Sequence, residues 1–315
     1  MKKGLINQVH VEGYLYEHKL ERKTSKKTNQ NYIAGTISVA TDEACSNIVE
    51  MFFMYVTPVY SKSQKDNPNY KVLDNIINSG TTKTIMGAGK ENALKVRVDG
   101  SIGLNEFYSK DDELVSIVRN EVSFINTTTS LNEDESKRNT FKNDMLITSV
   151  IRKEANDERN IPEHVVLKGA TINDFNKALL PVSFIVYHPG AMDYFEGLEP
   201  STSKPVFTKV AGNIVAQEFV SKVELEGACG QTLVEEKRST KKEYVVNWAQ
   251  NETYEWDNED GILASELKDM MSQRELHLAE IKKNKEEYQK SKESNGNTTP
   301  AAAPVSAPVA GDFKF

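Results

Sequence analysis

Cysteine is scarce in this sequence, and long apolar runs are absent. The two cysteines, Cys45 and Cys229, lie far apart and have neither the spacing of a metal site nor that of a disulfide framework. No run approaches the roughly eighteen apolar residues of a membrane-spanning helix, so we expect no membrane segment. The opening segment MKKGLINQVHVEG carries two lysines without an apolar core segment. We therefore predict no signal peptide and a reducing cytoplasm as the location.

Sequence motifs typical of catalytic or metal-binding sites are also scarce. The five histidines show no ligand spacing with cysteines or carboxylates. The segment GAGK at 87–90 is similar to part of a phosphate-binding loop, but Thr84 stands where the first glycine is needed and Glu91 follows the lysine. We predict a protein that is not an enzyme and that needs no cofactor and no metal. A nuclease stays as an alternative, and it would degrade an oligonucleotide in a metal-dependent way.

Positive charge is in the minority, with 39 lysines and arginines against 46 aspartates and glutamates and a net charge of −7. This balance counts against a nucleic-acid binder, which is usually basic. Phosphates are contacted by a local groove, however, and acidic loops elsewhere can outweigh that groove in the total. One basic run contains a single acid, Glu21, and it consists of Lys19, Arg22, Lys23, Lys26 and Lys27.

Strand patterns dominate the first third of the chain. Segments rich in valine, isoleucine and aromatic residues predict five strands, over 7–24, 31–43, 47–62, 94–104 and 114–125. Gly13 is the expected bend in the first of them. Between the third and fourth strands, the spacing predicts a helix over 70–80 that ends at Gly80. Three strands, a helix and two strands is the order of an OB-fold, a small five-stranded Greek-key barrel.

The same order of elements recurs downstream, although residue identity between the two halves is slight. The fold class that we predict is mainly β: tandem OB-fold barrels, then a C-terminal amphipathic helix and a disordered tail. The tail is rich in proline, alanine and serine and has nothing to bury. The expected units are the first barrel at 1–128, a linker at 129–140, the second barrel at 141–257, the helix at 258–292 and the tail at 293–315.

The C-terminal helix carries an apolar stripe at three- and four-residue steps. Arg274 interrupts this stripe, so a long coiled coil is not predicted. We expect the helix to pack on the second barrel, and self-association or partner binding stays open as the alternative. The stripe consists of Leu263, Leu267, Met270, Met271, Leu278 and Ile281.

Several segments of the first module resemble bacterial and phage single-stranded DNA-binding (SSB) proteins. They are VEGYL, AGTISVATDE, VEMFFMYV and VRVDGSIGLNEFYSKDDELVSIVRNEVSFI, and together they span about residues 5 to 126. A barrel, then a low-complexity linker, then a short tip that ends in phenylalanine is also similar to that family. The departures are the second barrel, the lysine-rich helix, and a tip in which Asp312 alone precedes Phe313. We therefore expect a phage or mobile-element variant.

Single-strand binders need aromatic faces for base stacking and a cationic groove for phosphates. The aromatic candidates are Tyr55, Phe107 and Tyr108, with Tyr14, Tyr16 and Tyr32 in reserve; the resemblance implies stacking roles for the first three. The alternative for each is a place in the core, and at least one of Phe52 and Phe53 is expected there, because adjacent strand residues face opposite sides. The cationic candidates are the basic run together with Arg97 and Arg119, and the alternative for the run is a solvated loop.

We predict a protein that coats single-stranded DNA during replication or recombination. The resemblance implies that the tail residues Asp312, Phe313 and Phe315 recruit replication or recombination proteins. The expected location is the cytoplasm, or the host cytoplasm if the chain is viral, and a homo-oligomer is left open. The alternative is an OB-fold scaffold or virion component that binds protein, which the acidic charge, the second barrel and the amphipathic helix favour.

Overall fold

The computed structural model describes residues 5–26, 28–60, 63–156, 161–173, 177–226, 232–256 and 263–294. For 217–226, 232–241 and 290–294 we describe the backbone alone. The prediction of a mainly β protein with a C-terminal helix is confirmed. None of the helices in these ranges is long and apolar enough to cross a membrane.

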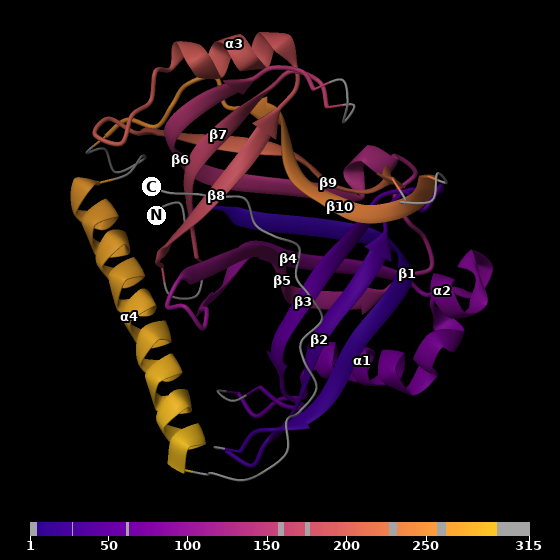
Figure 1. Ribbon diagram of the computed structural model, residues 1–315. Helices are drawn as coiled ribbons and strands as arrows, with labels where there is room; N and C mark the ends of the chain where they lie inside the picture. Colours follow the sequence, from indigo (N-terminus) through magenta and orange to yellow (C-terminus); the bar gives the residue numbers. More distant parts are fainter. Residues whose placement is uncertain are drawn as a thin grey trace.

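Five strands near the N-terminus pair into a closed ring (Figure 1). β1 pairs with β2, β2 with β3, β3 in parallel with β5, β5 with β4, and β4 with β1. Helix α1 and the short helix α2 lie between β3 and β4 in the chain, so the predicted order of three strands, helix and two strands is confirmed. The bounds are β1 Asn7–Thr24, β2 Asn31–Ala40, β3 Ile48–Val56, α1 Pro68–Ser79, α2 Ile85–Ala88, β4 Lys95–Tyr108 and β5 Leu114–Thr127.

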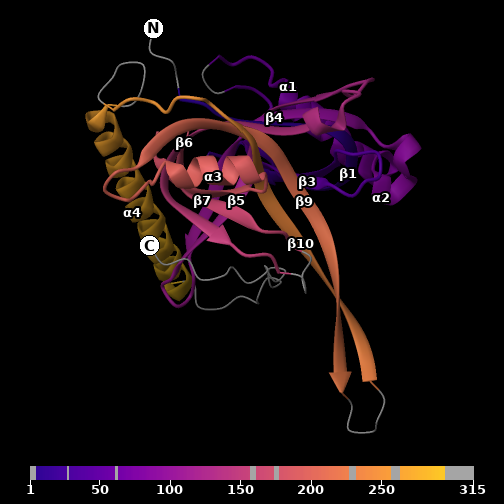
Figure 2. The same ribbon diagram turned by 90° about the horizontal axis from the view of Figure 1, so that it is seen from above.

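A second ring repeats these pairings. β6 pairs with β7, β7 with β8, β8 in parallel with β10, β10 with β9, and β9 with β6. The β9–β10 hairpin projects far from the body (Figure 2). A last helix, α4, lies along one side of the molecule. The bounds are β6 Asn139–Lys153, β7 His164–Ile172, β8 Leu179–Val186, α3 Pro189–Gly197, β9 Val206–Glu226, β10 Thr232–Ala249 and α4 Ala264–Ser294.

Local sequence explains the first helix. The Asn67 side chain accepts a hydrogen bond from the backbone N–H of Asn69, and Pro68 occupies the first turn, where its missing N–H costs nothing. Leu73 and Ile76 are buried against the ring. The helix ends where predicted, since Gly80 follows it with a φ of 55°.

The two rings meet through strand pairing and a buried polar network. β1 pairs with β6 from Asn7 opposite Asn143, which joins all ten strands into one sheet. The side-chain amide of Asn7 donates to a carbonyl of each ring, Ile102 O at 2.8 Å and Ile172 O at 2.9 Å. Buried polar groups need partners at fixed positions. The network therefore fixes how the rings sit against each other.

A second buried contact joins β10 to β5. The Tyr244 hydroxyl donates to Asn120 Oδ1 at 2.7 Å, and the Asn120 amide donates to Glu50 O at 3.0 Å. Burial raises the pKa of Tyr244, which keeps its hydroxyl protonated as a donor. Both side chains are almost completely buried. A continuous series of hydrogen bonds thus links Tyr244 of the second ring to Asn120 and Glu50 of the first ring.

We expect Tyr244→Phe to lower the free energy of unfolding by about 1–3 kcal/mol, because Asn120 Oδ1 would lose its donor in a buried place. Urea unfolding followed by circular dichroism measures the change. Tyr60→Phe is the control, since Tyr60 is exposed. Equal urea midpoints of unfolding for the two variants would show that the Tyr244 hydroxyl does not stabilise the fold.

Candidate nucleic-acid interface

Two tyrosines from neighbouring strands pack against each other on the outer surface of the first ring. Tyr32 in β2 and Tyr55 in β3 have ring centroids 4.3 Å apart and planes inclined at 33°. Ile33 is fully buried, so strand alternation places its neighbour Tyr32 outside. Tyr55 is 45% exposed, and its hydroxyl lies 3.4 Å from Thr28 Oγ1. The pair presents flat ring surface to solvent.

A third aromatic residue, Phe52, lies on this surface under a guanidinium group. Phe52 points outward between the buried residues Met51 and Phe53, so the prediction that at least one of Phe52 and Phe53 is in the core is confirmed. The Arg119 guanidinium lies 4.0 Å from the centroid of the Phe52 ring. Arg119 Nε also donates to Glu121 Oε1 at 2.9 Å. The guanidinium thus lies within cation–π distance of the Phe52 ring while it is also paired with Glu121.

The β4–β5 hairpin extends the surface. Gly103 is the register partner of Arg119, and Phe107 lies four residues further along β4 with no bulge between them. Strand alternation therefore places Phe107 on the same face as Arg119, and Phe107 is 43% exposed. We call this set the aromatic face; it consists of Tyr32, Phe52, Tyr55, Phe107 and Arg119.

Tyr108 lies on the other side of the hairpin. It follows Phe107 in β4, so its side chain points to the opposite face, and it is half-buried. Glu106 shares that side and bonds to Arg274 in α4. The structure thus places the two adjacent aromatic candidates on opposite sides of the hairpin, with Phe107 on the aromatic face.

Two lysines of the basic run border the aromatic face. Lys23 lies in register with Tyr32, and Lys19 lies in register with Thr36 on the same side of the sheet. Each is paired with an acid two residues earlier, Lys23 with Glu21 at 2.9 Å and Lys19 with Glu17 at 3.5 Å. Exposed ion pairs of this kind contribute little free energy. A phosphate can therefore replace the carboxylate at small cost.

Other predicted cations have different partners. Arg22 Nε donates to Asp74 Oδ1 in α1 at 2.8 Å, on the opposite side of β1 from Lys19 and Lys23. Arg97 Nε donates to the buried Glu12 carboxylate at 2.8 Å. Lys26 is exposed, and Lys27 lies outside the described residues. The structure does not bring Arg22 or Arg97 to the aromatic face.

The reserve tyrosines of β1 lie elsewhere. Tyr14 pairs with Ala40, eight residues and about 26 Å along β2 from Tyr32. Its ring lies under the ammonium groups of Lys90 and Lys95, at 4.9 and 5.6 Å. Tyr16 is half-buried at the irregularity of the β1–β2 register. The predicted tail residues Asp312, Phe313 and Phe315 lie outside the described residues.

Sequence reasoning missed two features of this interface. The contact between Phe52 and Arg119 depends on the parallel pairing of β3 with β5, which no local pattern reveals. The packing of α4 on the hairpin was missed as well. The available signal was Arg274, whose charge interrupts an apolar stripe because it meets Glu106.

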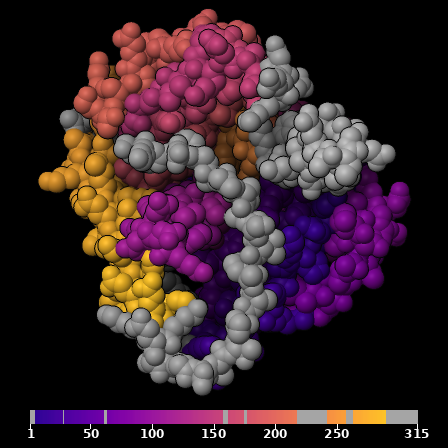
Figure 3. All heavy atoms as spheres, viewed as in Figure 1, coloured from indigo at the N-terminus to yellow at the C-terminus, as the bar shows by residue number. Residues whose placement is uncertain are grey.

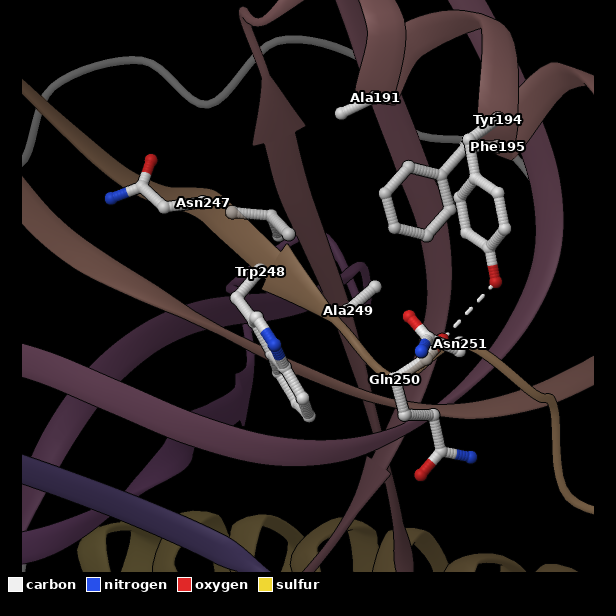
Figure 4. Close-up of a pocket in the computed structure, with 9 residues that line it drawn as sticks. Ala191, Tyr194, Phe195, Asn247, Trp248, Ala249, Gln250 and Asn251 are labelled. Carbon is white, nitrogen blue, oxygen red and sulfur yellow. Dashed lines mark hydrogen bonds between the residues drawn. The ribbon is translucent and has the colours of Figure 1, made fainter.

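A hollow of ≈ 200 Å³ lies on the second ring, between α3 and the end of β10 (Figure 4). Tyr194 and Phe195 of α3 form one wall, and the Tyr194 hydroxyl donates to Gln250 O at 3.3 Å. Trp248 borders the hollow and is 52% exposed. In the described part of the chain, no group of three or more histidine, cysteine or acidic side chains is placed to hold a metal ion.

Comparison with known proteins gives a family. The family model described as YorF matches residues 6–294. No curated protein matches the chain significantly. Among solved structures, a crystal structure of a deletion mutant of the single-stranded DNA binding protein from Thermus aquaticus is similar, with 13% sequence identity, a TM-score of 0.43, and coverage of 78% of this chain and 94% of that chain. At this identity and TM-score we infer function from the geometry of the present chain alone.

Proposed function

The chain belongs to the YorF family, and we propose that it binds single-stranded DNA across the aromatic face. The observation that carries the proposal is the contact of the half-buried Tyr32 with the exposed Tyr55, whose ring centroids lie 4.3 Å apart, on the same surface as Phe52 and the exposed Phe107. The exposed rings of Tyr55 and Phe107 offer flat apolar surface to a ligand. Unpaired bases stack on aromatic side chains with about 1–3 kcal/mol each, whatever their sequence.

The strand pairings support an OB-fold for each ring. In both, the first strand pairs with the second and fourth, and the third pairs in parallel with the fifth. This is the connectivity of a Greek-key barrel of that kind, a fold whose second and third strands carry nucleic-acid sites. We propose two barrels within the expected units at 1–128 and 141–257, with a linker at 129–140, a helix at 258–292 and a tail at 293–315. The strands and the helix themselves begin and end at slightly different residues, since β6 begins at Asn139 and α4 spans Ala264–Ser294.

In this proposal, basic side chains neutralise DNA phosphates by exchanging a carboxylate partner for a phosphate. Lys19, Lys23 and Arg119 already face carboxylates of the same surface. Binding DNA replaces these carboxylates with phosphates, so few counterions are released for each contact. The salt dependence of binding is then shallower than for a protein with free lysines, and base stacking provides most of the affinity.

The remaining parts of the proposal concern biological context. A protein that coats single strands serves replication or recombination, in a phage or mobile element and in its host's cytoplasm. The tail would recruit a replication or recombination protein through Asp312, Phe313 and Phe315. The sequence of that tip supports the idea, since two aromatic residues follow a long segment that has nothing to bury.

The test is a titration of fluorescein-labelled oligo-dT of about 20 nucleotides, a length that covers at least one OB-fold site. Anisotropy of the label is the readout, because both tryptophans, Trp248 and Trp256, lie in the second half of the chain and none lies in the first ring. We expect saturable binding at about 50 mM salt that weakens only moderately at about 200 mM. Absence of binding at the lower salt would overturn the proposal.

A protein-binding scaffold or virion component is the second candidate. The pairing of Lys19, Lys23, Arg22, Arg97 and Arg119 with carboxylates favours it, together with the net charge of −7. Such a protein would use the exposed rings to contact another protein. It would show no oligo-dT binding at low salt, and the titration therefore separates the two candidates.

A further inference from the structure

Helix α4 contacts both rings. Near its start, Met270 is buried, and Leu267 packs against Leu146 and Phe207 of the second ring. Further along, α4 runs beside the β4–β5 hairpin of the first ring (Figure 1). The atoms of α4, in yellow and gold, lie against purple atoms of the first ring in Figure 3. The expectation that the helix packs on the second ring thus describes only the first turns of the helix, since Arg274 already contacts the first ring.

A buried ion pair fastens the helix to the hairpin. The Arg274 guanidinium donates to both oxygens of Glu106, whose side chain is 0% exposed, while that of Arg274 is 13% exposed. Ser116 Oγ of the paired strand donates to Glu106 Oε1 at 2.7 Å, and His277 Nε2 lies 3.6 Å from Glu106 Oε2. Burial opposes ionisation of Glu106, but the hydrogen bonds from Arg274 and Ser116 outweigh it and lower its pKa.

A second fastening holds the turn of the hairpin. Lys285 Nζ, about three helical turns beyond Arg274, donates to Ser109 O at 2.6 Å and to Asp112 Oδ1 at 2.7 Å. Asp112 has a φ of 66°, which fits the tight turn between the strands. Both fastenings lie on the side of Glu106 and Tyr108. The aromatic face includes Phe107, on the opposite side of the hairpin from Glu106, so these contacts of α4 do not cover it.

We propose that α4 is a brace that holds the β4–β5 hairpin in position for binding, with Arg274 and Glu106 as positioning residues; this rests on the proposed function. A two-stranded hairpin that extends beyond its ring is marginally stable alone. The hairpin carries Phe107, which must stay in line with Phe52 and Tyr55 if one strand of DNA is to stack on all three. Because α4 contacts the side of the hairpin opposite Phe107, it lowers the conformational entropy that the hairpin loses when DNA binds.

The proposal is tested first without DNA, by hydrogen exchange of the backbone amides in 104–118. Arg274→Met removes the guanidinium that neutralises the buried Glu106 carboxylate, which is strongly unfavourable, so the hairpin should separate from α4. We expect exchange at least about tenfold faster in this segment. Lys268→Met is the matched control, because Lys268 is exposed on the same helix and the variant loses the same charge. Its exchange should equal that of the wild type.

Affinity for labelled oligo-dT is the second readout. We expect Arg274→Met to bind about tenfold more weakly. The double variant Glu106→Met with Arg274→Met replaces the ion pair with apolar contact, which buried sites often tolerate. It should restore both slow exchange and affinity, a rescue that a direct contact between Arg274 and phosphate would not give.

Unchanged exchange in Arg274→Met would overturn the brace. Tighter DNA binding by that variant would also overturn it, since α4 would then be a cover that blocks the site. If the double variant recovers slow exchange but not affinity, Arg274 touches DNA and is not a positioning residue. If the wild type itself binds no oligo-dT, the proposed function fails, and hydrogen exchange alone decides whether α4 supports the hairpin.

Discussion

Tyr55→Ala is expected to weaken the binding of oligo-dT by roughly 5- to 150-fold, which corresponds to about 1–3 kcal/mol for one lost stacking surface. The loss has two parts. Tyr55 is itself an exposed platform, and its ring also supports that of Tyr32 at 4.3 Å. Without it, the Tyr32 ring regains rotational freedom and presents a less ordered surface to a base.

Two controls make this experiment specific. Tyr55→Phe keeps the ring and removes only the hydroxyl, whose distance of 3.4 Å from Thr28 Oγ1 marks a weak contact, so affinity should stay within about twofold. Trp248→Ala removes a large exposed aromatic from the second ring, 52% exposed. It should leave affinity unchanged if the first ring carries the site. Equal affinities of Tyr55→Ala and the wild type, measured by anisotropy at low salt, would reject the aromatic face.

The position of Tyr55 shows how much of the site could be predicted from the sequence. The resemblance to SSB proteins selected Tyr55 as a stacking candidate, and Tyr32 was held in reserve as an aromatic residue of a predicted strand. Their contact was not predictable, because it depends on the register of β2 against β3, which shifts by a residue between Ile33 and Gly35. An irregularity of this kind changes which side chains meet without leaving a clear local signal.

For the basic run, the two-residue period of a β-strand could have been applied but was not. Arg22 was grouped with Lys19 and Lys23 because all three are positively charged. The period of two along a strand separates them, and Arg22 accordingly meets Asp74 of α1 on the other side. Phe107 and Tyr108 were grouped in the same way, and alternation again divides them. Applying the strand period to each candidate would have predicted both separations.

Long-range contacts were beyond the reach of local patterns. The order of strands and helix in the first ring followed from hydrophobic periodicity, and the structure confirms it. The pairing of β1 with β6, however, joins Asn7 to Asn143, and the α4 contact joins Glu106 to Arg274. Such contacts depend on how complete elements pack, and each residue concerned looks like ordinary polar surface when the sequence is read locally.

Gly13 lies where β1 changes from pairing with β4 alone to pairing with both β4 and β2. It was expected to be a bend in the first strand. In the structure, β1 pairs with β4 at Gly13 opposite Val96, and its pairing with β2 begins one residue later, with Tyr14 opposite Ala40. One strand is thus shared by two neighbours at this point. A Cβ atom at Gly13 would lie 2.0 Å from the carbonyl oxygen of Ala40.

Gly13→Ala is therefore expected to lower the free energy of unfolding by on the order of 3 kcal/mol. The obstructing atom belongs to the backbone, so no side chain can turn away to make room. Relief requires β2 to move outward, which weakens the closure of the ring. Because Tyr32 lies on β2, the same movement should reduce affinity for oligo-dT even under conditions where the variant is folded.

Urea unfolding followed by circular dichroism measures the stability change, and Gly197→Ala is the matched control. Gly197 is the last residue of α3, and no atom lies within 4 Å of the place a Cβ would occupy. Alanine there should be neutral or stabilising by up to about 1 kcal/mol, since it is a better helix former than glycine. If Gly13→Ala unfolds at the same urea concentration as Gly197→Ala, β1 and β2 are not held as closely as ring closure requires. The surface that presents Tyr32 and Tyr55 would then lack the rigid base on which base stacking depends.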